Sequence, residues 1–309
     1  MRELRDRVVA EVGKVIVGQR DAIEAILIAT AIGGHVLLEG VPGVAKTLLA
    51  RAVARATGVE FGRVQFTPDM LPSDLTGTVT LRGGELKFRP GPVFTNLLLA
   101  DEINRTPPKT QAALLEAMQE RQVTVDGVSH ALPSPFVVVA TQNPIEYEGT
   151  YPLPEAQLDR FVFKVDVAYP SEDEETAIVH MQHRGVSPVT LDEVHPVVSP
   201  EGIGAAAGDV DATTVTPEIE RYVTSIVRRT RDLPSVELGG SPRAGVHLLA
   251  ASKCYARISG RDYVTPDDVA HMAHPVLRHR LVLRPEAELE RYRPDDAVRA
   301  ALGSVPVPR

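Results

Sequence analysis

The sequence has little cysteine: Cys254 is the single thiol among 309 residues. One thiol can form neither an internal disulfide nor a metal site built on several thiolates. Such scarcity is typical of a reducing compartment, and the hydrophobic core is the ordinary place for a lone cysteine. The sequence therefore excludes a disulfide-stabilised scaffold and a multi-thiolate metal centre.

Long apolar runs and an excess of positive charge are also missing. No stretch reaches the ~20 residues that a membrane-spanning helix needs, and Met1 to Glu11 is dense in charge, unlike a signal peptide. The formal net charge is -8, whereas proteins that bind phosphates across a broad surface usually carry a basic face. We therefore expect a cytoplasmic protein without membrane insertion, and the charge disfavours nucleic acid as a partner.

The chain is long enough for more than one domain, and its hydrophobic fraction of 43% supplies material for a buried core. From His35 to about Val167, short apolar runs alternate with amphipathic stretches, which is typical of a parallel sheet covered by helices. Helices are expected over Lys46–Ala56 and Pro108–Glu120. The expected strands are His35–Glu39, Glu60–Phe66, Asn96–Ala100, Phe136–Ala140 and Phe161–Val165.

Beyond Tyr169 the pattern indicates helices only. Thr216-Pro217, Ser241-Pro242 and Thr265-Pro266 each combine an N-cap residue with proline at the first helical position. Asp268 completes a capping-box pattern after the last of these. Before them lies a loose segment, residues 185–211, rich in Pro, Gly, Val and Ala, which the sequence does not define as hinge, linker or packed structure.

A glycine-rich motif stands between the first expected strand and the next helix. It reads Gly40-Val41-Pro42-Gly43-Val44-Ala45-Lys46-Thr47. Backbone N–H groups of such a turn cradle phosphates, the lysine meets the β- and γ-phosphates, and the threonine offers its hydroxyl to Mg²⁺. Ala45 stands where the general motif has its last glycine, so we expect its backbone to lie already in the helical region. The alternative is an ordinary strand-to-helix turn.

Polar residues end two further strands. Asp101 and Glu102 follow an apolar strand, so the first can hold Mg²⁺ while the second polarises water. Asn143 follows Phe136–Ala140 and could reach the γ-phosphate or the attacking water. Alone, a pair of acids at a strand end is often just solvated, and an asparagine before Pro144 is a common turn residue.

These motifs, in this order and together with Leu153-Pro-Glu-Ala-Gln-Leu-Asp-Arg160-Phe161 and Ser241-Pro-Arg243, resemble the MoxR branch of AAA+ ATPases. The resemblance extends from Val17-Gly18-Gln19 to about His279, and Ala45 also matches it. It implies an α/β P-loop NTPase (AAA+) three-layer sandwich with a parallel sheet, followed by a small all-helical lid domain. We expect the nucleotide-binding domain at 1–170, a connecting segment at 171–215 and the lid at 216–309.

The same resemblance implies a role for each site residue. Glu102 becomes the Walker B glutamate, Asn143 sensor 1, Arg160 an arginine finger acting on a neighbouring subunit, and Arg243 sensor 2, in cis or in trans. Both arginines could instead make ordinary salt bridges or face solvent. The residues expected to hold ATP are Val17, Gly18, Gly40, Val41, Pro42, Gly43, Val44, Ala45, Lys46, Thr47, Leu48 and Asp101, with Thr47 and Asp101 also holding Mg²⁺.

Two hairpins interrupt the α/β pattern. One turns at Gly83-Gly84 inside what resembles the helix-2 insert, about 67–93, and the other turns at Asp126-Gly127 within about 120–135. Each could be surface decoration. The resemblance implies instead that they face the ring pore or the partner and transmit the nucleotide state.

The resemblance implies an ATPase that works as a homo-oligomeric, hexameric ring and remodels, activates or matures client proteins, commonly ones with a von Willebrand factor A domain. This chain has no such domain. Three alternatives stay open: a chelatase-like motor subunit for metal insertion, a nucleic-acid-translocating motor, and a module in which ATP is a slowly hydrolysed switch.

Overall fold

The computed structural model describes residues 1–143, 149–183 and 191–308, and they form two compact units. The first, which we call the sheet unit, comprises Leu4–Leu153 and Val165–Gly204. The second, the helical unit, comprises Met1–Glu3, Pro154–Lys164 and Ala205–Arg309. Both units are therefore assembled from separate stretches of the chain.

A five-stranded sheet in the order β2-β5-β8-β1-β9 forms the centre of the sheet unit. β2, β5, β8 and β1 pair in parallel, and all five residues of β5 are buried. Their apolar runs are continuous because helices cover both faces of such a sheet. The strands are β1 (Val36–Gly40), β2 (Phe61–Gln65), β5 (Leu97–Asp101), β8 (Val137–Gln142) and β9 (Phe163–Val167). All five predicted strands are confirmed, with ends shifted by one or two residues.

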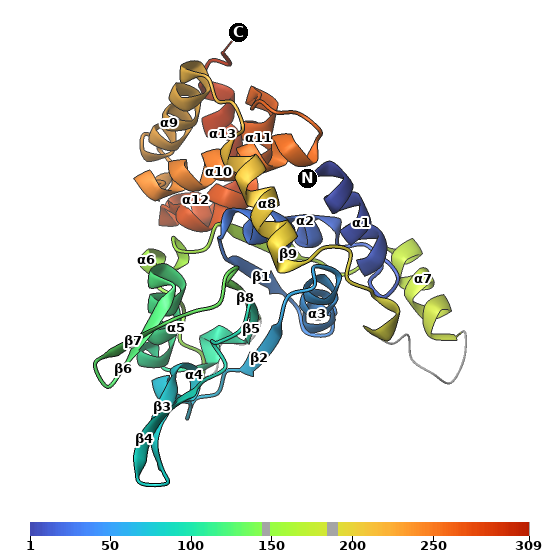
Figure 1. Cartoon of the computed structure of the whole chain (residues 1–309). Coiled ribbons are helices and arrows are strands. Elements are labelled where there is room, and N and C mark those ends of the chain that lie inside the picture. The colour runs from blue at the N-terminus through green and yellow to red at the C-terminus, as the bar shows by residue number, and fades with distance from the viewer. Residues whose placement is uncertain (144–148, 184–190, 309) are drawn as a thin grey trace. The chain divides into compact units, whose positions relative to one another are not determined.

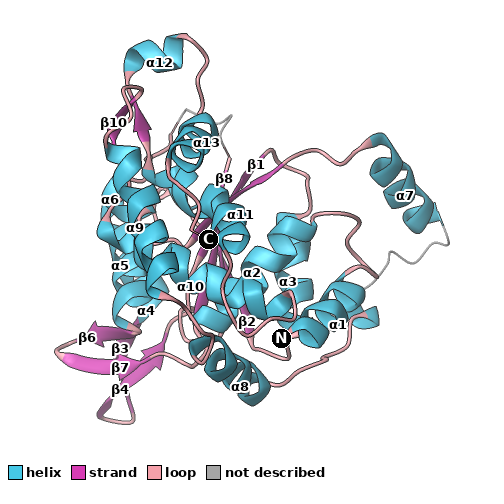
Figure 2. Ribbon diagram, turned by 90° about the horizontal axis from the view of Figure 1, so that it is seen from above, coloured by secondary structure: helices cyan, strands magenta, loops and turns pink. Residues whose placement is uncertain are grey.

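Helices flank this sheet, and Figures 1 and 2 show α3 and α5 on opposite sides of it. α3 (Lys46–Ala56) and α5 (Pro108–Glu120) have the predicted bounds. Small buried residues, such as Ala50 and Ala54, let α3 lie close to the strands. The other helices of this unit are α1 (Arg2–Val12), α2 (Arg20–Ile32), α4 (Pro72–Thr76) and α7 (Glu172–His183).

Both predicted hairpins are present and lie side by side at one end of the sheet unit (Figures 1 and 2). They are β3 (Gly77–Arg82) with β4 (Glu85–Pro90), and β6 (Gln122–Val125) with β7 (Val128–Ala131). The turn residues Gly83, Gly84, Asp126 and Gly127 all have positive φ, as a two-residue hairpin turn requires. The ring of Phe88 stacks on that of His130 with centroids 3.8 Å apart, which joins the two hairpins.

The helical unit begins its helices at the predicted positions. α9, α10 and α11 start at the three prolines, and the Thr265–Asp268 capping box is formed. Cys254 is buried in α10, as expected, and burial raises the pKa of its thiol to about 12. The helices of this unit are α6 (Glu155–Leu158), α9 (Pro217–Arg231), α10 (Pro242–Ile258), α11 (Pro266–Leu277), α12 (Pro285–Leu289) and α13 (Pro294–Ser304).

Two features of this part of the chain differ from the sequence prediction. β10 (Val236–Leu238) and β11 (Val282–Leu283) form a short antiparallel pair where helices alone were expected. Runs of two and three residues are too short to show an alternating pattern. The segment described as loose contains α8 (Pro200–Asp211), while its residues 185–190 lie outside the described part. No helix among the described residues is both long enough and apolar enough to cross a membrane.

Candidate functional site

The glycine-rich turn joins the end of β1 to the start of α3 and forms one wall of a cavity of about 410 Å³. Gly43 has φ +86, and a Cβ added to it would meet nothing within 4 Å, so the turn is open there. The registers Glu39↔Gln142 and Gln65↔Asp101 place the ends of four strands in one row beside it. The cavity is lined by Pro42, Gly43, Val44, Ala45, Lys46, Thr47, Leu48, Arg63, Gln65, Asp101, Glu102, Thr141, Gln142 and Asn143.

Ala45 does not lie in the right-handed helical region, contrary to the expectation. Its φ of 60° and ψ of 23° are left-handed, and it occupies the N-cap position of α3. A single residue in the left-handed conformation turns the chain from the glycine-rich turn into α3. A glycine at this position would adopt that conformation without steric strain from a Cβ atom. For an L-residue this conformation costs about 1–2 kcal/mol. The turn therefore stores backbone strain directly before Lys46.

Lys46 is half-buried, and its ammonium group donates hydrogen bonds to the carbonyl oxygens of Gly40 and Val41. Burial lowers the pKa of this amine, while the carboxylates of Asp101, Glu102 and Glu39 oppose that shift. Three neighbouring carboxylates keep a cation favourable at this end of the sheet. The side chain therefore holds positive charge at the mouth of the turn, where the N-terminus of α3 adds to it.

The carboxylate of Asp101 has three polar neighbours. Its Oδ1 accepts a hydrogen bond from the hydroxyl of Thr141 at 2.7 Å, and its Oδ2 accepts one from Thr47 Oγ1 at 3.3 Å. Arg63 from β2 also reaches Oδ2, at 2.9 Å. Mg²⁺ prefers oxygen ligands and usually takes only one or two from the protein. A hydroxyl and a carboxylate oxygen side by side therefore fit Mg²⁺ at this position.

Glu102 follows directly and also has a left-handed backbone, with φ 58°. Its N–H donates to Thr141 Oγ1 at 2.8 Å, so one buried hydroxyl orients both acidic residues. Its Oε2 accepts a hydrogen bond from the Gln65 side-chain amide at 2.6 Å and pairs with Arg105 at 3.1 Å. These contacts hold the carboxylate at the edge of the cavity, and the Glu102 side chain is 27% exposed.

Asn143 completes the set from the sheet. It is buried, with 7% exposed, and lines the same cavity just beyond the end of β8. The predicted motif continues with Pro144, which lies outside the described residues. The glycine-rich turn and the two strand ends marked in the sequence, those of β5 and β8, therefore converge on one cavity, and β2 adds a third strand end that was not predicted.

A second cavity, of about 340 Å³, lies between residues 17–22 and residues 165–170. Val17 and Gly18 line it together with Tyr169 and Pro170. Gly18 has φ +72, a left-handed conformation that favours glycine, and the carboxylate of Glu174 lies directly beside its Cα. Gln19 connects the two cavities, because its side chain donates to the carbonyl oxygen of Val44 at 2.7 Å.

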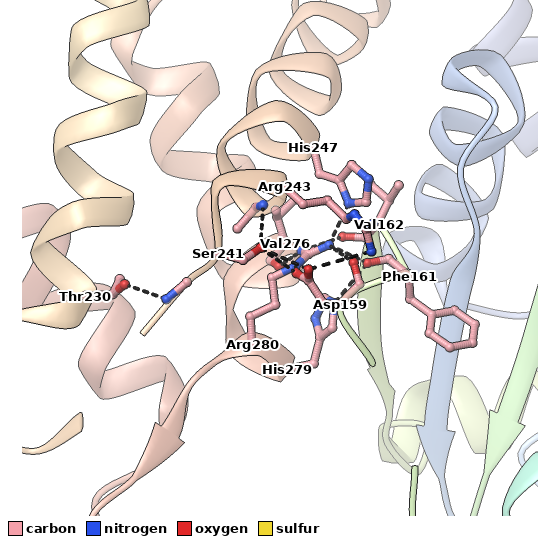
Figure 3. Close-up of polar contacts among 12 residues, drawn as sticks. Asp159, Phe161, Val162, Thr230, Ser241, Arg243, His247, Val276, His279 and Arg280 are labelled. Atoms are coloured by element: carbon pink, nitrogen blue, oxygen red, sulfur yellow. Dashed lines mark hydrogen bonds and ion pairs between the residues drawn. The ribbon is translucent and has the colours of Figure 1, made fainter. Parts of the chain in front are cut away.

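Arg160 and Arg243 belong to the helical unit, not to the unit that forms these cavities. Arg160 is half-buried and follows α6, while Arg243 lies in the first turn of α10 and is 43% exposed. Arg243 pairs with Asp159, the residue before Arg160, at 3.8 Å (Figure 3). The two predicted arginines thus lie on one unit and share a carboxylate neighbour.

Sequence reasoning missed five side chains that contact residues of this site: Gln19, Arg63, Gln65, Arg105 and Thr141. Gln65 and Thr141 stand at strand ends, so the rule that polar residues gather at the carboxyl edge of a parallel sheet could have found them. Arg63 lies two residues before the end of β2 and gives no such signal.

Comparisons with known proteins agree with this geometry. The chain matches the "ATPase family associated with various cellular activities (AAA)" over residues 35–163 and the "AAA lid domain" over residues 228–301. A solved structure from Cytophaga hutchinsonii has a TM-score of 0.92 and 39% identity, covering 100% of this chain and 96% of that one.

Several curated relatives match nearly the full length. The Chaperone MoxR1 of Mycobacterium tuberculosis is 45% identical, over 98% of this chain and 82% of that protein. Protein MoxR of Paracoccus denitrificans is 34% identical, over 97% and 95%. The uncharacterized protein YeaC of Bacillus subtilis is 47% identical, over 100% and 96%.

Proposed function

The chain belongs to the MoxR family of AAA+ ATPases, and we propose that it hydrolyses ATP in a homo-oligomeric, hexameric ring to remodel, activate or mature partner proteins. One observation carries the catalytic part of this proposal. A single cavity brings together Lys46, Thr47, Asp101, Glu102 and Asn143. Their chemistry matches what phosphoryl transfer to water needs: phosphate binding, metal binding, a base and a polar group that positions the water.

Each side chain has a distinct part in the proposed reaction. Lys46 and the N–H groups of the turn bind the phosphates, and Thr47 and Asp101 hold Mg²⁺, which when bound neutralises phosphate charge. Glu102 accepts the proton of the attacking water at its carboxylate. Asn143 orients that water or the γ-phosphate. The cavity beside Val17 and Gly18 takes the adenine.

Arg160 acts on a neighbouring subunit in this proposal. A guanidinium is a permanent planar cation, so it can stabilise the charge that develops on the γ-phosphate during transfer. Arg243, in the same unit, senses nucleotide in cis or in trans. Hydrolysis then changes the position of the helical unit, and this movement remodels the client protein.

The client surface in this proposal includes the two hairpins. Leu81, Leu86 and Val128 at their ends are exposed by 57% or more, which gives a partner apolar contacts. The stacked pair of Phe88 and His130 makes the hairpins one surface. A protein with a von Willebrand factor A domain is the partner that the family resemblance favours.

The replacement of Glu102 by glutamine tests the catalytic proposal. Glu102→Gln keeps the shape of the side chain and its contact with Gln65 but cannot accept a proton. We expect Mg²⁺-dependent hydrolysis to fall by at least about 10²-fold while ATP binding is retained, because a general base contributes ~10²–10⁴-fold. Glu116→Gln, an exposed residue of α5, is the control and should keep full activity. Steady-state hydrolysis by Glu102→Gln at the wild-type rate would rule out this role.

A further inference from the structure

A buried guanidinium, that of Arg280, contacts the segment that carries Arg160 and connects it to the rest of the helical unit (Figure 3). Arg280 follows α11, in the 3-10 turn Arg278–Arg280, and its side chain is only 1% exposed. Burial lowers its pKa to about 10, so it stays charged at neutral pH, and Asp159 supports the charge. A buried cation needs partners for its N–H groups.

The acceptors of Arg280 surround Arg160 in the sequence. Its Nε donates to Asp159 Oδ1 at 2.7 Å. Other N–H groups donate to the carbonyl oxygens of Asp159 at 3.2 Å, Phe161 at 2.6 Å and Val162 at 3.3 Å. Remaining contacts go to Val276 O and to His247 Nδ1. The Arg280 side chain therefore holds the backbone on both sides of Arg160, and His279 Nε2 adds a contact of 3.0 Å to the carbonyl oxygen of Phe161.

Asp159 extends this connection to α10. Its two carboxylate oxygens accept hydrogen bonds from Ser241 Oγ at 3.0 and 2.9 Å. Ser241 is the N-cap of α10, and Arg243, two residues later, lies 3.8 Å from the same carboxylate. The Asp159 carboxylate therefore connects the segment that carries Arg160 to α10, the helix that carries Arg243.

We propose that Asp159 and Arg280 are positioning residues for Arg160: they fix the finger segment to α10, so that Arg160 and Arg243 move as one body. This inference rests on the proposed role of Arg160 in hydrolysis. When the helical unit of one subunit moves, the finger that it presents to the neighbour moves with it. Neither Asp159 nor Arg280 touches nucleotide in this scheme.

Asp159→Asn tests the inference, because asparagine keeps the size of the side chain and removes the charge that pairs with Arg280. The matched control is Asp268→Asn. Asp268 pairs with Arg261 in the same unit at 2.5 Å, and its side chain is 1% exposed. Its carboxylate also accepts a hydrogen bond from the hydroxyl of Thr265, the N-cap residue of α11. Both variants lose one arginine-paired carboxylate of this unit, 19% exposed at Asp159 and 1% at Asp268, but only Asp159 is joined to the finger segment.

We expect Asp159→Asn to lower kcat by at least about tenfold with the KM for ATP changed by less than about twofold, since small misplacements of a positioned group cost up to ~10²-fold. Asp268→Asn should lower Tm and keep kcat. Relative to the residual activity of Arg160→Ala, the double variant with Asp159→Asn should show no further loss, because the effect of Asp159 acts through Arg160. A loss that adds fully to that of Arg160→Ala would overturn the inference.

Other outcomes separate the inference from the proposed function. If Arg160→Ala abolishes hydrolysis and Asp159→Asn does not lower kcat, only the positioning role is wrong. If Arg160→Ala keeps full activity, the finger and the positioning role both fail. If Asp159→Asn does not fold, Ser241→Ala replaces it as a milder variant, with Thr265→Ala as its control. Ser241→Ala should then have the lower kcat, and equal kcat values for the two variants would contradict the inference.

Discussion

Two catalytic-site residues other than glycine, Ala45 and Glu102, have left-handed backbones. Ala45 is the N-cap of α3, directly before Lys46, and Glu102 follows Asp101, the last residue of β5. Such conformations persist only where the surroundings hold them, and they aim neighbouring groups at the cavity. The backbone strain at these two residues is visible in the structure but could not be predicted from the sequence motif.

Substitutions at Ala45 should separate backbone strain from side-chain effects. Ala45→Gly relieves the left-handed conformation, so we expect Tm to be unchanged or raised, whereas Ala45→Val should lower it by at least about 2 °C. Ala50→Gly is the control. It makes the same change in the right-handed interior of α3 and should be destabilising by about 1 kcal/mol. Thermal unfolding followed by circular dichroism measures all three; equal losses for Ala45→Gly and Ala50→Gly would contradict the account.

Several residues that line the candidate site could be predicted from the sequence, but part of their environment could not. Lys46 is marked by the glycine-rich motif and Asp101 and Asn143 by strand-end motifs, and the structure places all three on one cavity. Arg63 reaches Asp101 from a different strand, 38 positions away, and only the order of strands in the sheet brings them together.

At the scale of elements, turn and cap chemistry was the most reliable guide. Gly83-Gly84 and Asp126-Gly127 predicted both hairpins because their residues tolerate positive φ. The Ser241 cap was likewise predicted and is formed, whereas Thr216 occupies its N-cap position without a side-chain hydrogen bond to the helix. The pair β10–β11 was missed because its strands are too short to show a pattern.

The contact between α10 and the turn after α11 should make stability depend on pH. Burial, and next the charge of Arg280, lowers the pKa of His247 to about 4; Arg243 acts the same way and Asp159 opposes it. Between pH 6.5 and 4 the unfolded chain therefore binds a proton that the folded chain does not. The free energy of unfolding thus falls as the pH falls through this window.

His247→Gln removes that titration and keeps an acceptor for Arg280. Between pH 7.5 and 5, Tm of the wild type should fall by at least about 2 °C more than Tm of the variant. His279, buried and also with a lowered pKa, contributes in the same direction to both proteins. An identical pH dependence of Tm for the two would show that His247 does not contribute.

At the scale of the whole molecule, the division into units explains what the sequence could not show. The helical unit includes Pro154–Lys164 from the middle of the chain. Asp159 and Arg280 are 121 positions apart, and nothing local to either residue indicates that they pair. The order of the motifs was enough to predict the α/β fold and the helical lid. The contacts between segments far apart in the sequence could not be predicted and are visible only in the structure.

If one subunit completes the site of the next, mixing two variants that each lack one catalytic group should restore hydrolysis. Glu102→Gln lacks the base and Arg160→Ala lacks the finger. In a mixed ring, a site with Glu102 from one subunit and Arg160 from its neighbour is intact. The measurement is Mg²⁺-dependent ATP hydrolysis of each variant and of their mixture across a dilution series. We predict that the mixture recovers activity which rises with protein concentration; a mixture as inactive as its components at every concentration would contradict the account.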